Sequence, residues 1–138
     1  MEHRKLSIAV ALIKNEEGKI LLQRRIDPKI PSAHGKWEFP GGKVESHESA
    51  EQTAIRESKE EIGCDIKLIR KLPIVVTQSW EKTDGEKLDV EVCCYEAILM
   101  SGIGQPLDKK VSEVVWLHKE EIQNLDTLPA IKDFIDAL

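Results

Sequence analysis

Three glutamates in the middle of the chain have the type and spacing that best suit chemistry. Glu57, Glu60 and Glu61 fall within an arc of roughly 100° if their segment is a helix that turns 100° per residue. Residues 48–61 carry five acidic and two basic side chains, which gives a local net charge of −3. Such a stripe is either a solvated helix face or a holder of a divalent cation, because Mg²⁺ prefers hard carboxylate oxygens. Taken alone, the triplet favours the solvated face.

The residues upstream of the stripe favour the cation instead. Pro40-Gly41-Gly42 lies directly before it, and glycines let a backbone pack closely and aim its carbonyls or amides at a ligand. Glu48 and Arg56 are eight positions apart, which is too far for helix neighbours. They can pair only if a loop folds back, and such a pair would lock the loop against the helix.

The pattern over residues 42–64 resembles the Nudix box, a loop–helix–loop of hydrolases that act on nucleoside diphosphates linked to another moiety. Every fixed Gly, Glu and Arg of that box is present, namely Gly42, Glu48, Arg56, Glu57, Glu60, Glu61 and Gly63. Ser58 stands where the family has an aliphatic residue, and we expect slightly weaker helix packing there without loss of chemistry. Cys64 also stands at an aliphatic position, which a small hydrophobic thiol can fill.

The resemblance extends to the MutT branch of that family, the small diphosphatases that remove oxidised nucleoside triphosphates. Residues 6–14, 23–25 and 37–45 look like this branch, and the similarity is good through residue 63 and thin afterwards. The resemblance implies one Nudix domain over residues 1–138. It also implies an α+β fold in which an α/β/α sandwich surrounds a mixed sheet.

The resemblance assigns roles to the box residues. Mg²⁺, or Mn²⁺, would bind the Gly41 carbonyl and the carboxylates of Glu57, Glu60 and Glu61. It would act as a Lewis acid and help to make hydroxide from water. Glu57 is the candidate general base, although some relatives use a glutamate outside the box. Arg56 belongs to the catalytic set as an orienting residue, and Glu48 supports it through a salt bridge.

A further acidic metal ligand is expected outside the box, after the third-quarter strand. Anchoring the alignment on Trp116 puts Lys110 at that position, with Asp108 and Glu113 on either side. Neither acid aligns cleanly. Both stay candidates, with a surface position as the alternative for Glu113.

The resemblance to the MutT branch implies several substrate-binding residues, and some of them have an alternative structural interpretation. Arg24 matches a substrate-contacting arginine, or it is a solvated cation at a strand end. Phe39 matches a wall of the base pocket, or it packs in the core. Gly42 completes the set that we expect to bind substrate. Trp80, in an expected loop over residues 79–87, either stacks on a base or anchors the loop.

The identity of the base stays open at this stage. The branch reads the base with an asparagine just after a Pro-Ala pair, whereas Ile131 follows Pro129-Ala130 here. Isoleucine cannot hydrogen-bond to a purine edge. Loss of a polar side chain that recognises the base can greatly reduce the discrimination between one base and another. Asp126 would substitute in a different register. Oxidised purines such as 8-oxo-dGTP and pyrimidine nucleotides such as CTP or 5-methyl-dCTP are therefore both candidates.

The implied reaction is attack of water on phosphorus, which splits a nucleoside triphosphate into the monophosphate and pyrophosphate. One alternative is a hydrolase of ADP-ribose or a dinucleoside polyphosphate, although ADP-ribose enzymes usually bring extra N-terminal sequence. Another is a non-catalytic nucleotide-binding Nudix module, although such modules commonly lose box carboxylates. A purely structural domain would need the whole pattern to be accidental.

Composition excludes several other classes. The 138 residues are 41% hydrophobic and 33% charged, so we expect one packed domain. The net charge of −5 argues against a nucleic-acid binder. The longest apolar run, residues 8–13, is far short of the ~20 residues that span a bilayer, and we see no signal peptide. Three cysteines without a disulfide pattern favour the cytoplasm. We expect a small nucleotide as partner, and a monomer or homodimer.

The elements that must position these residues follow from pattern and turn signals. We expect strands at residues 6–14, 19–24, 37–39, 66–76, 90–100 and 111–117. Turns are expected at residues 15–18, 40–42 and 84–85, and a loop at residues 25–36. A helix over residues 50–62 has Ser49 as N-cap, Gln52 for a capping box and Gly63 to end it. Two shorter helices are expected at residues 119–124 and 129–138. We expect the core-facing flank of the first helix to be Ile55, Ser58 and Ile62.

Overall fold

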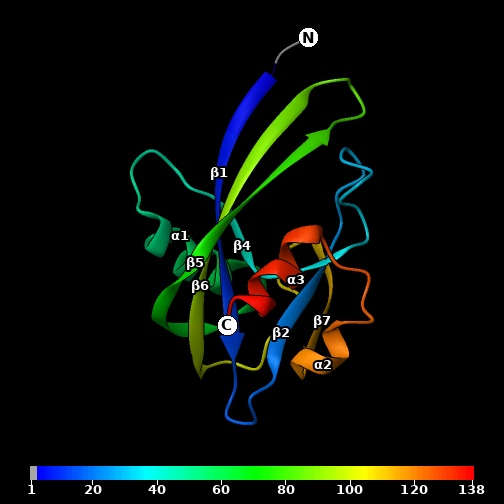
Figure 1. Ribbon diagram of the computed structural model, residues 1–138. Coiled ribbons are helices and arrows are strands. Elements are labelled where there is room, and N and C mark those ends of the chain that lie inside the picture. Colours follow the sequence, from blue (N-terminus) through cyan, green and yellow to red (C-terminus); the bar gives the residue numbers. More distant parts are fainter. Residues whose placement is uncertain (1–2) are drawn as a thin grey trace.

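The computed structural model describes residues 3–138, and its strands form one mixed sheet (Figure 1). The strands are β1 (His3–Lys14), β2 (Ile20–Arg25), β3 (Trp37–Glu38), β4 (Gly41–Lys43), β5 (Asp65–Glu81), β6 (Lys87–Ser101) and β7 (Val111–Leu117). Their order is β3-β2-β1-β6-β5, with β4 paired to β1 and β7 paired to β2. β1 and β6 run parallel, whereas the other neighbouring strands run antiparallel.

Helices cover both faces of this sheet, which confirms the expected sandwich. The helices are α1 (Ala50–Ile62), α2 (Lys119–Ile122) and α3 (Pro129–Asp136), and α1 and α3 lie on opposite sides in Figure 1. Side chains of β1 alternate between the two cores, as the pleat of a strand requires. Val10 and Leu12 pack in the core that contains α3, and Ala11 and Ile13 in the core that contains α1. Within residues 3–138, no helix is long and apolar enough to cross a membrane.

Local signals at the ends of α1 act as predicted. The Ser49 side chain accepts a hydrogen bond from the Gln52 backbone N–H, and the Gln52 side chain accepts one from the Ser49 N–H. Gly63 ends the helix in the left-handed conformation, with φ of 68°. The helix therefore begins and ends where the sequence places it.

The expected core flank of α1 is partly wrong. Ile55 is 42% exposed, whereas Ala54, Ser58 and Ile62 are fully buried. Small side chains at positions 54 and 58 let the helix approach the sheet closely, and the Ser58 hydroxyl donates to the Ala54 carbonyl at 2.7 Å. Because this hydroxyl has a partner, Ser58 is tolerated at a buried position.

The segment after β3 is not the simple turn predicted for residues 40–42. β1 and β2 pair only at their hairpin end, and the segment that follows β3 passes from β2 to β1. Gly41, Gly42 and Lys43 form the short strand β4 opposite Val10, Ala9 and Ile8. This crossing puts the two glycines beneath α1.

The hairpin of β5 and β6 extends further than predicted. β6 pairs with β1 over all twelve residues of that strand, and β1 and the hairpin together extend beyond the other strands of the sheet (Figure 1). Trp80 consequently lies in β5, not in a loop, and it is 8% exposed in the core. The predicted apolar anchoring of Trp80 is therefore confirmed, whereas the predicted loop from which it would stack on a base is not present.

Candidate active site

The packing of α1 against β4 sets the geometry of the glutamate stripe. The backbone N–H of Gly41 donates to Glu61 Oε1 at 3.0 Å. A Cβ at position 41 would lie 2.3 Å from the Ala9 carbonyl oxygen, and one at position 42 would lie 2.8 Å from the carboxyl carbon of Glu57. Gly41 is therefore needed for β4 to lie against β1, and Gly42 for the Glu57 carboxylate to lie against β4.

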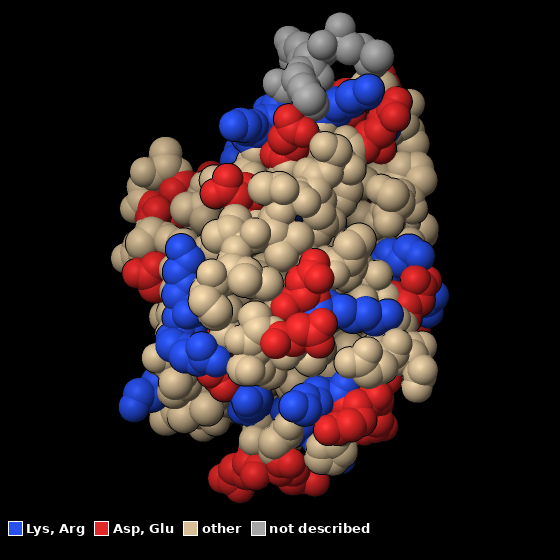
Figure 2. Space-filling model, in the orientation of Figure 1, with Lys and Arg blue, Asp and Glu red and all other residues tan. Residues whose placement is uncertain are grey.

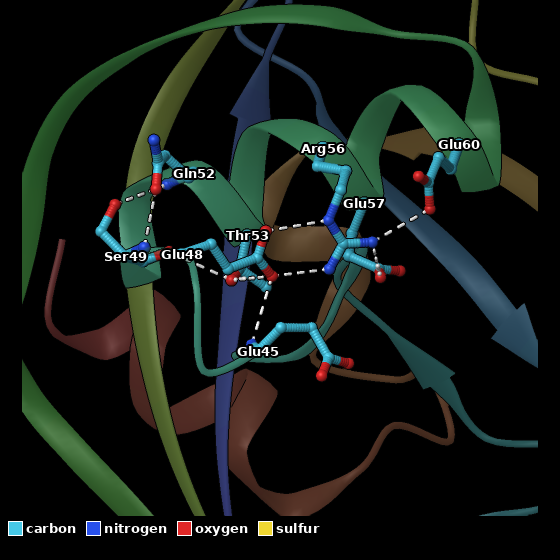
Figure 3. A network of polar contacts seen from close by, with 8 residues as sticks. All are labelled: Glu45, Glu48, Ser49, Gln52, Thr53, Arg56, Glu57 and Glu60. Atoms are coloured by element: carbon cyan, nitrogen blue, oxygen red, sulfur yellow. Dashed lines mark hydrogen bonds and ion pairs between the residues drawn. The ribbon is translucent and has the colours of Figure 1, made fainter.

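A bidentate ion pair joins the preceding loop to the helix (Figure 3). Arg56 Nη2 lies 2.7 Å from Glu48 Oε1, and Arg56 Nε lies 3.0 Å from Glu48 Oε2. Thr53 Oγ1 also donates to Glu48 at 2.7 Å. These hydrogen bonds, first those from Arg56, lower the pKa of Glu48 to about 2. The folded-back loop expected from the eight-residue spacing is present.

The same guanidinium reaches the stripe itself. Arg56 Nη1 lies 2.7 Å from Glu57 Oε1 and 3.1 Å from Glu60 Oε2 (Figure 3). Arg56 thus ties the loop carboxylate of Glu48 to two of the three helix glutamates. Such forked contacts fix orientation as well as charge, because the guanidinium is planar and its donors point in set directions.

The three glutamates differ in their surroundings. Glu60 has a largely exposed side chain, Glu57 is half-buried, and Glu61 is only 8% exposed. Burial raises the pKa of Glu61 to about 8, and the charges of Glu38 and Glu57 add to the rise. Burial also raises the pKa of Glu57, against the opposing effect of Arg56. A bound cation would offset the burial of these acids and the repulsion between their charges.

Two polar residues of this region, one buried and one partly buried, were missed from sequence. Glu38 of β3 pairs with Arg25 Nη1 at 3.3 Å and accepts from Gln23 Nε2 at 3.2 Å. Gln23 directly follows the apolar run of β2 and is fully buried like that run, although it is polar. The signal available was a polar residue inside a strand pattern that otherwise predicts core.

The side chains are not drawn together as a preformed metal site. Within residues 3–138, no group of three His, Cys, Asp or Glu side chains lies close enough to hold a metal ion. Glu57 and Glu60 turn towards Arg56, and Glu61 turns towards the Gly41 N–H. The donor set nevertheless fits a hard divalent cation, because it consists of carboxylate and backbone oxygens, one of them on a buried acid.

The remaining candidates, Arg24, Asp108 and Glu113, have partners outside the stripe. Arg24 donates to the Gly35 carbonyl at 3.0 Å and pairs with Glu113 at 3.2 Å, with both side chains exposed. Asp108 accepts from the Lys110 N–H in the turn before β7. Among residues 3–138, neither Glu113 nor Asp108 forms a hydrogen bond with the stripe. The positive charge of Lys110 adds, after Arg56, to the effects that oppose the burial-driven rise in the pKa of Glu57.

The positions considered for base recognition are 39, 126 and 131, and two of them lie in the core that contains α3. Phe39 is 1% exposed and Ile131 is 3% exposed, and both pack in that core. Asp126 is exposed and pairs with Lys36 Nζ at 2.8 Å. The box residues are thus joined by direct ion pairs, whereas the candidates for base recognition pack in the core or pair with Lys36.

Comparisons with known proteins identify the family of this chain. The NUDIX domain profile matches residues 3–138. An 8-oxo-dGTP diphosphatase of Escherichia coli (strain K12) is 47% identical over 137 residues, which cover 98% of this chain and 97% of that protein. A CTP pyrophosphohydrolase of the same organism is 46% identical over 61 residues, 44% of each chain. The crystal structure of a MutT protein from Methanosarcina mazei Go1 superposes with a TM-score of 0.74 at 28% identity, and the match covers 99% of this chain and 94% of that one. The chain belongs to the NUDIX family.

Proposed function

We propose that this chain is a divalent-metal-dependent pyrophosphohydrolase that converts a nucleoside triphosphate and water into the monophosphate and pyrophosphate. The observation that supports it most is the stripe of Glu57 and Glu61 held against the Gly41-Gly42 strand by backbone contact and by Arg56. An exposed structural helix face would not bury one of its glutamates. It would not require a glycine against Glu57 either.

Mg²⁺ or Mn²⁺ would be held by the carboxylates of Glu57, Glu60 and Glu61 together with the Gly41 carbonyl. When bound, the ion would act as a Lewis acid on the polyphosphate and make the attacking water more acidic. The chain's own contribution is orientation. The Gly41 N–H holds Glu61, and Arg56 holds Glu57 and Glu60.

Glu57 is our candidate for the general base. Its half-buried carboxylate has a pKa raised by burial, so its oxygens accept a proton more readily than those of an exposed glutamate. Arg56, fixed by Glu48, keeps one of these oxygens in place without reacting itself. The proton of the attacking water would pass to the Glu57 carboxylate as the bond to phosphorus forms.

Oxidised purine triphosphates are the first substrate class that we propose, and their removal would cleanse the nucleotide pool. The support is the relative named 8-oxo-dGTP diphosphatase, which matches almost the whole chain. CTP-type pyrimidines are a second candidate, because Ile131 is a buried apolar residue where the MutT branch has an amide. The partial match to a CTP pyrophosphohydrolase points the same way.

We further infer a monomer or homodimer that acts on small nucleotides in the cytoplasm, without stable nucleic-acid or membrane partners. Cys64, Cys93 and Cys94 are free thiols in the described part of the chain, which suits a reducing compartment. On the face shown in Figure 2, basic and acidic side chains alternate in small groups without an extended basic surface. Glu113 and Asp108 stay candidates for an additional ligand.

A substrate panel tests the reaction. The protein is incubated with Mg²⁺ and separately with 8-oxo-dGTP, dGTP, CTP, 5-methyl-dCTP and ADP-ribose, and pyrophosphate, monophosphate and AMP are quantified. We expect pyrophosphate and monophosphate in equal amounts from at least one triphosphate. Turnover of ADP-ribose alone would move the chain to a different diphosphatase class. Binding of nucleotide without turnover of any compound would favour a non-catalytic module.

A further inference from the structure

A buried threonine hydroxyl lies where the loop before α1 meets the helix (Figure 3). Thr53, the fourth residue of α1, is fully buried. Its Oγ1 lies 2.7 Å from Glu48 Oε1 and 3.1 Å from the Ser49 carbonyl oxygen. A hydroxyl has one proton to donate, and the charged carboxylate at the shorter distance is the stronger acceptor. The proton therefore points to Glu48, and not to the carbonyl four residues back to which threonines in helices often donate.

The Glu48 carboxylate depends on donors from the protein. Its side chain is only 6% exposed, so few of its hydrogen bonds can go to water. Arg56 donates through Nε and Nη2, and the Glu45 N–H lies 3.3 Å from Oε1. Among residues 3–138, Arg56 and Thr53 are the two side chains that donate a hydrogen bond to Glu48. Thr53 is thus the donor that holds this carboxylate from the helix side when Arg56 moves.

The orientation of Glu48 sets that of Arg56, and through it that of the stripe. The Nε and Nη2 groups of Arg56 face Glu48, whereas Nη1 contacts Glu57 at 2.7 Å and Glu60 at 3.1 Å. Because the guanidinium is planar, a rotation of the Glu48 carboxylate would turn Nη1 away from both glutamates. Hydrogen bonds thus connect the Thr53 hydroxyl to the candidate general base in three steps.

We propose that Thr53 is a positioning residue for the hydrolysis, which fixes the Glu48 carboxylate so that Arg56 holds Glu57 in place. The inference rests on the proposed function. Position 53 is not one of the fixed positions of the box, so the family pattern assigns it no role. The contact depends on the hydroxyl alone, so serine preserves it and valine, which has the same shape, removes it.

A purely structural role makes a different prediction. If the hydroxyl only satisfies the helix, its removal lowers stability and leaves the active site unchanged. Ser58 offers the matched control, because its buried hydroxyl lies on the same helix and donates to the Ala54 carbonyl at 2.7 Å. This hydrogen bond stays within α1. Ser58→Ala should therefore unfold more easily and keep the kcat of the wild type.

Steady-state kinetics compare the wild type with Thr53→Val, Thr53→Ser and Ser58→Ala. The assay uses Mg²⁺ and the best triphosphate of the panel. We expect Thr53→Val to lower kcat about tenfold with little change in KM, because a displaced base slows the chemical step. Thr53→Ser should restore kcat to nearly the wild-type value.

A double-mutant cycle tests whether Thr53 acts through Glu48. In Glu48→Ala the carboxylate that Thr53 orients is absent, so adding Thr53→Val should lower kcat no further. Independent sites instead give additive effects. Additive losses in the double variant would contradict the connection through Glu48.

Nitrogen NMR of the Arg56 Nε–H group gives a readout that needs neither metal nor substrate. Glu48 accepts from this group at 3.0 Å, so its proton should exchange slowly with water in the wild type and in Thr53→Ser. In Thr53→Val we expect exchange about tenfold faster, as for a weakened hydrogen bond to a charged group. The signal is assigned by its absence from Arg56→Lys.

Failure of this inference is distinguishable from failure of the proposed function. Wild-type kcat in Thr53→Val, or a lowered kcat with unchanged exchange at Arg56, overturns the role of Thr53 alone. A wild type that hydrolyses no triphosphate overturns the proposed function and the inference with it. If circular dichroism shows that Thr53→Val does not fold, Thr53→Ala removes the same hydroxyl. The same losses are then expected, and unchanged values contradict the proposal.

Discussion

The three glutamates of the stripe differ in how deeply their side chains are buried. Glu61 is held by a backbone N–H and by its buried neighbours, whereas Glu57 is half-buried and held by Arg56. Glu60 reaches into solvent apart from its contact with Arg56. A buried carboxylate suits a fixed metal ligand, and a half-buried one suits a group that must also exchange a proton.

Glu57→Gln and Glu61→Gln should each lower kcat by about 10²-fold or more, the range expected for loss of a positioned base or metal ligand. Steady-state pyrophosphate release with the best triphosphate of the panel measures this. Glu51→Gln is the matched control, because it makes the same change on α1 at a residue whose side chain contacts Tyr95. Wild-type rates in both stripe variants would refute the assigned roles.

Glu48→Gln should lower stability in a pH-dependent way. The folded protein depresses the pKa of Glu48 from 4.5 to about 2, so its ionised form stabilises the fold above pH 4.5. That contribution disappears as the pH falls from about 4.5 to about 2. Urea unfolding at several pH values should show a full gap between wild type and variant near neutrality that closes on acidification. A gap of constant size would show that the charge of Glu48 is not involved.

At the level of elements, local signals predicted α1, and pairing between distant segments decided what was missed. Ser49 and Gly63 act within a few residues, so the helix ends are readable from sequence. β4 forms because the chain after β3 crosses from β2 to β1, and no local sequence pattern predicts this crossing. The exposure of Ile55 depends likewise on how closely α1 approaches the sheet.

The two glycines of β4 should fail in different ways when replaced by alanine. At position 41 the new Cβ meets the backbone oxygen of Ala9 at 2.3 Å, so we expect Gly41→Ala to destabilise the fold. At position 42 it meets the end of the flexible Glu57 side chain at 2.8 Å, which can move aside. Gly42→Ala should therefore keep most of the stability and lose activity at least tenfold, since a base displaced by about 1 Å can cost that much or more.

Thermal unfolding and pyrophosphate release on the two variants check this contrast. Equal stability losses in both, with activity that simply follows the folded fraction, would contradict the contact between Gly42 and Glu57. An active Gly42→Ala variant would remove Glu57 from the catalytic set.

On the scale of the molecule, two helix layers enclose a sheet whose parallel pair, β1 and β6, joins distant parts of the chain. The resemblance to the family predicted this sandwich, because members of a family share their fold. It did not predict Gln23 and Glu38, which meet only through the register of β2 and β3. Residues whose role depends on such a register look like ordinary strand positions in the sequence.

The fold should not depend on the metal. Arg56 and the Gly41 N–H already hold the stripe in place, so the carboxylates need no cation to keep their positions. Treatment with EDTA should abolish turnover and leave the far-ultraviolet circular dichroism unchanged, and added Mg²⁺ should restore activity. Turnover that persists after complete chelation would contradict the proposed mechanism, and unfolding on chelation would make the ion structural.

The central claim is that the stripe of α1 binds divalent cations against a diphosphate bond, and anomalous diffraction tests it most directly. Crystals grown with Mn²⁺ and a triphosphate analogue blocked at the bond between the α and β phosphates should show an anomalous peak. We expect that peak among the Gly41 carbonyl, Glu57, Glu60 and Glu61, in contact with the phosphates. A nucleotide bound elsewhere, with the stripe free of metal and turned to solvent, would contradict the account.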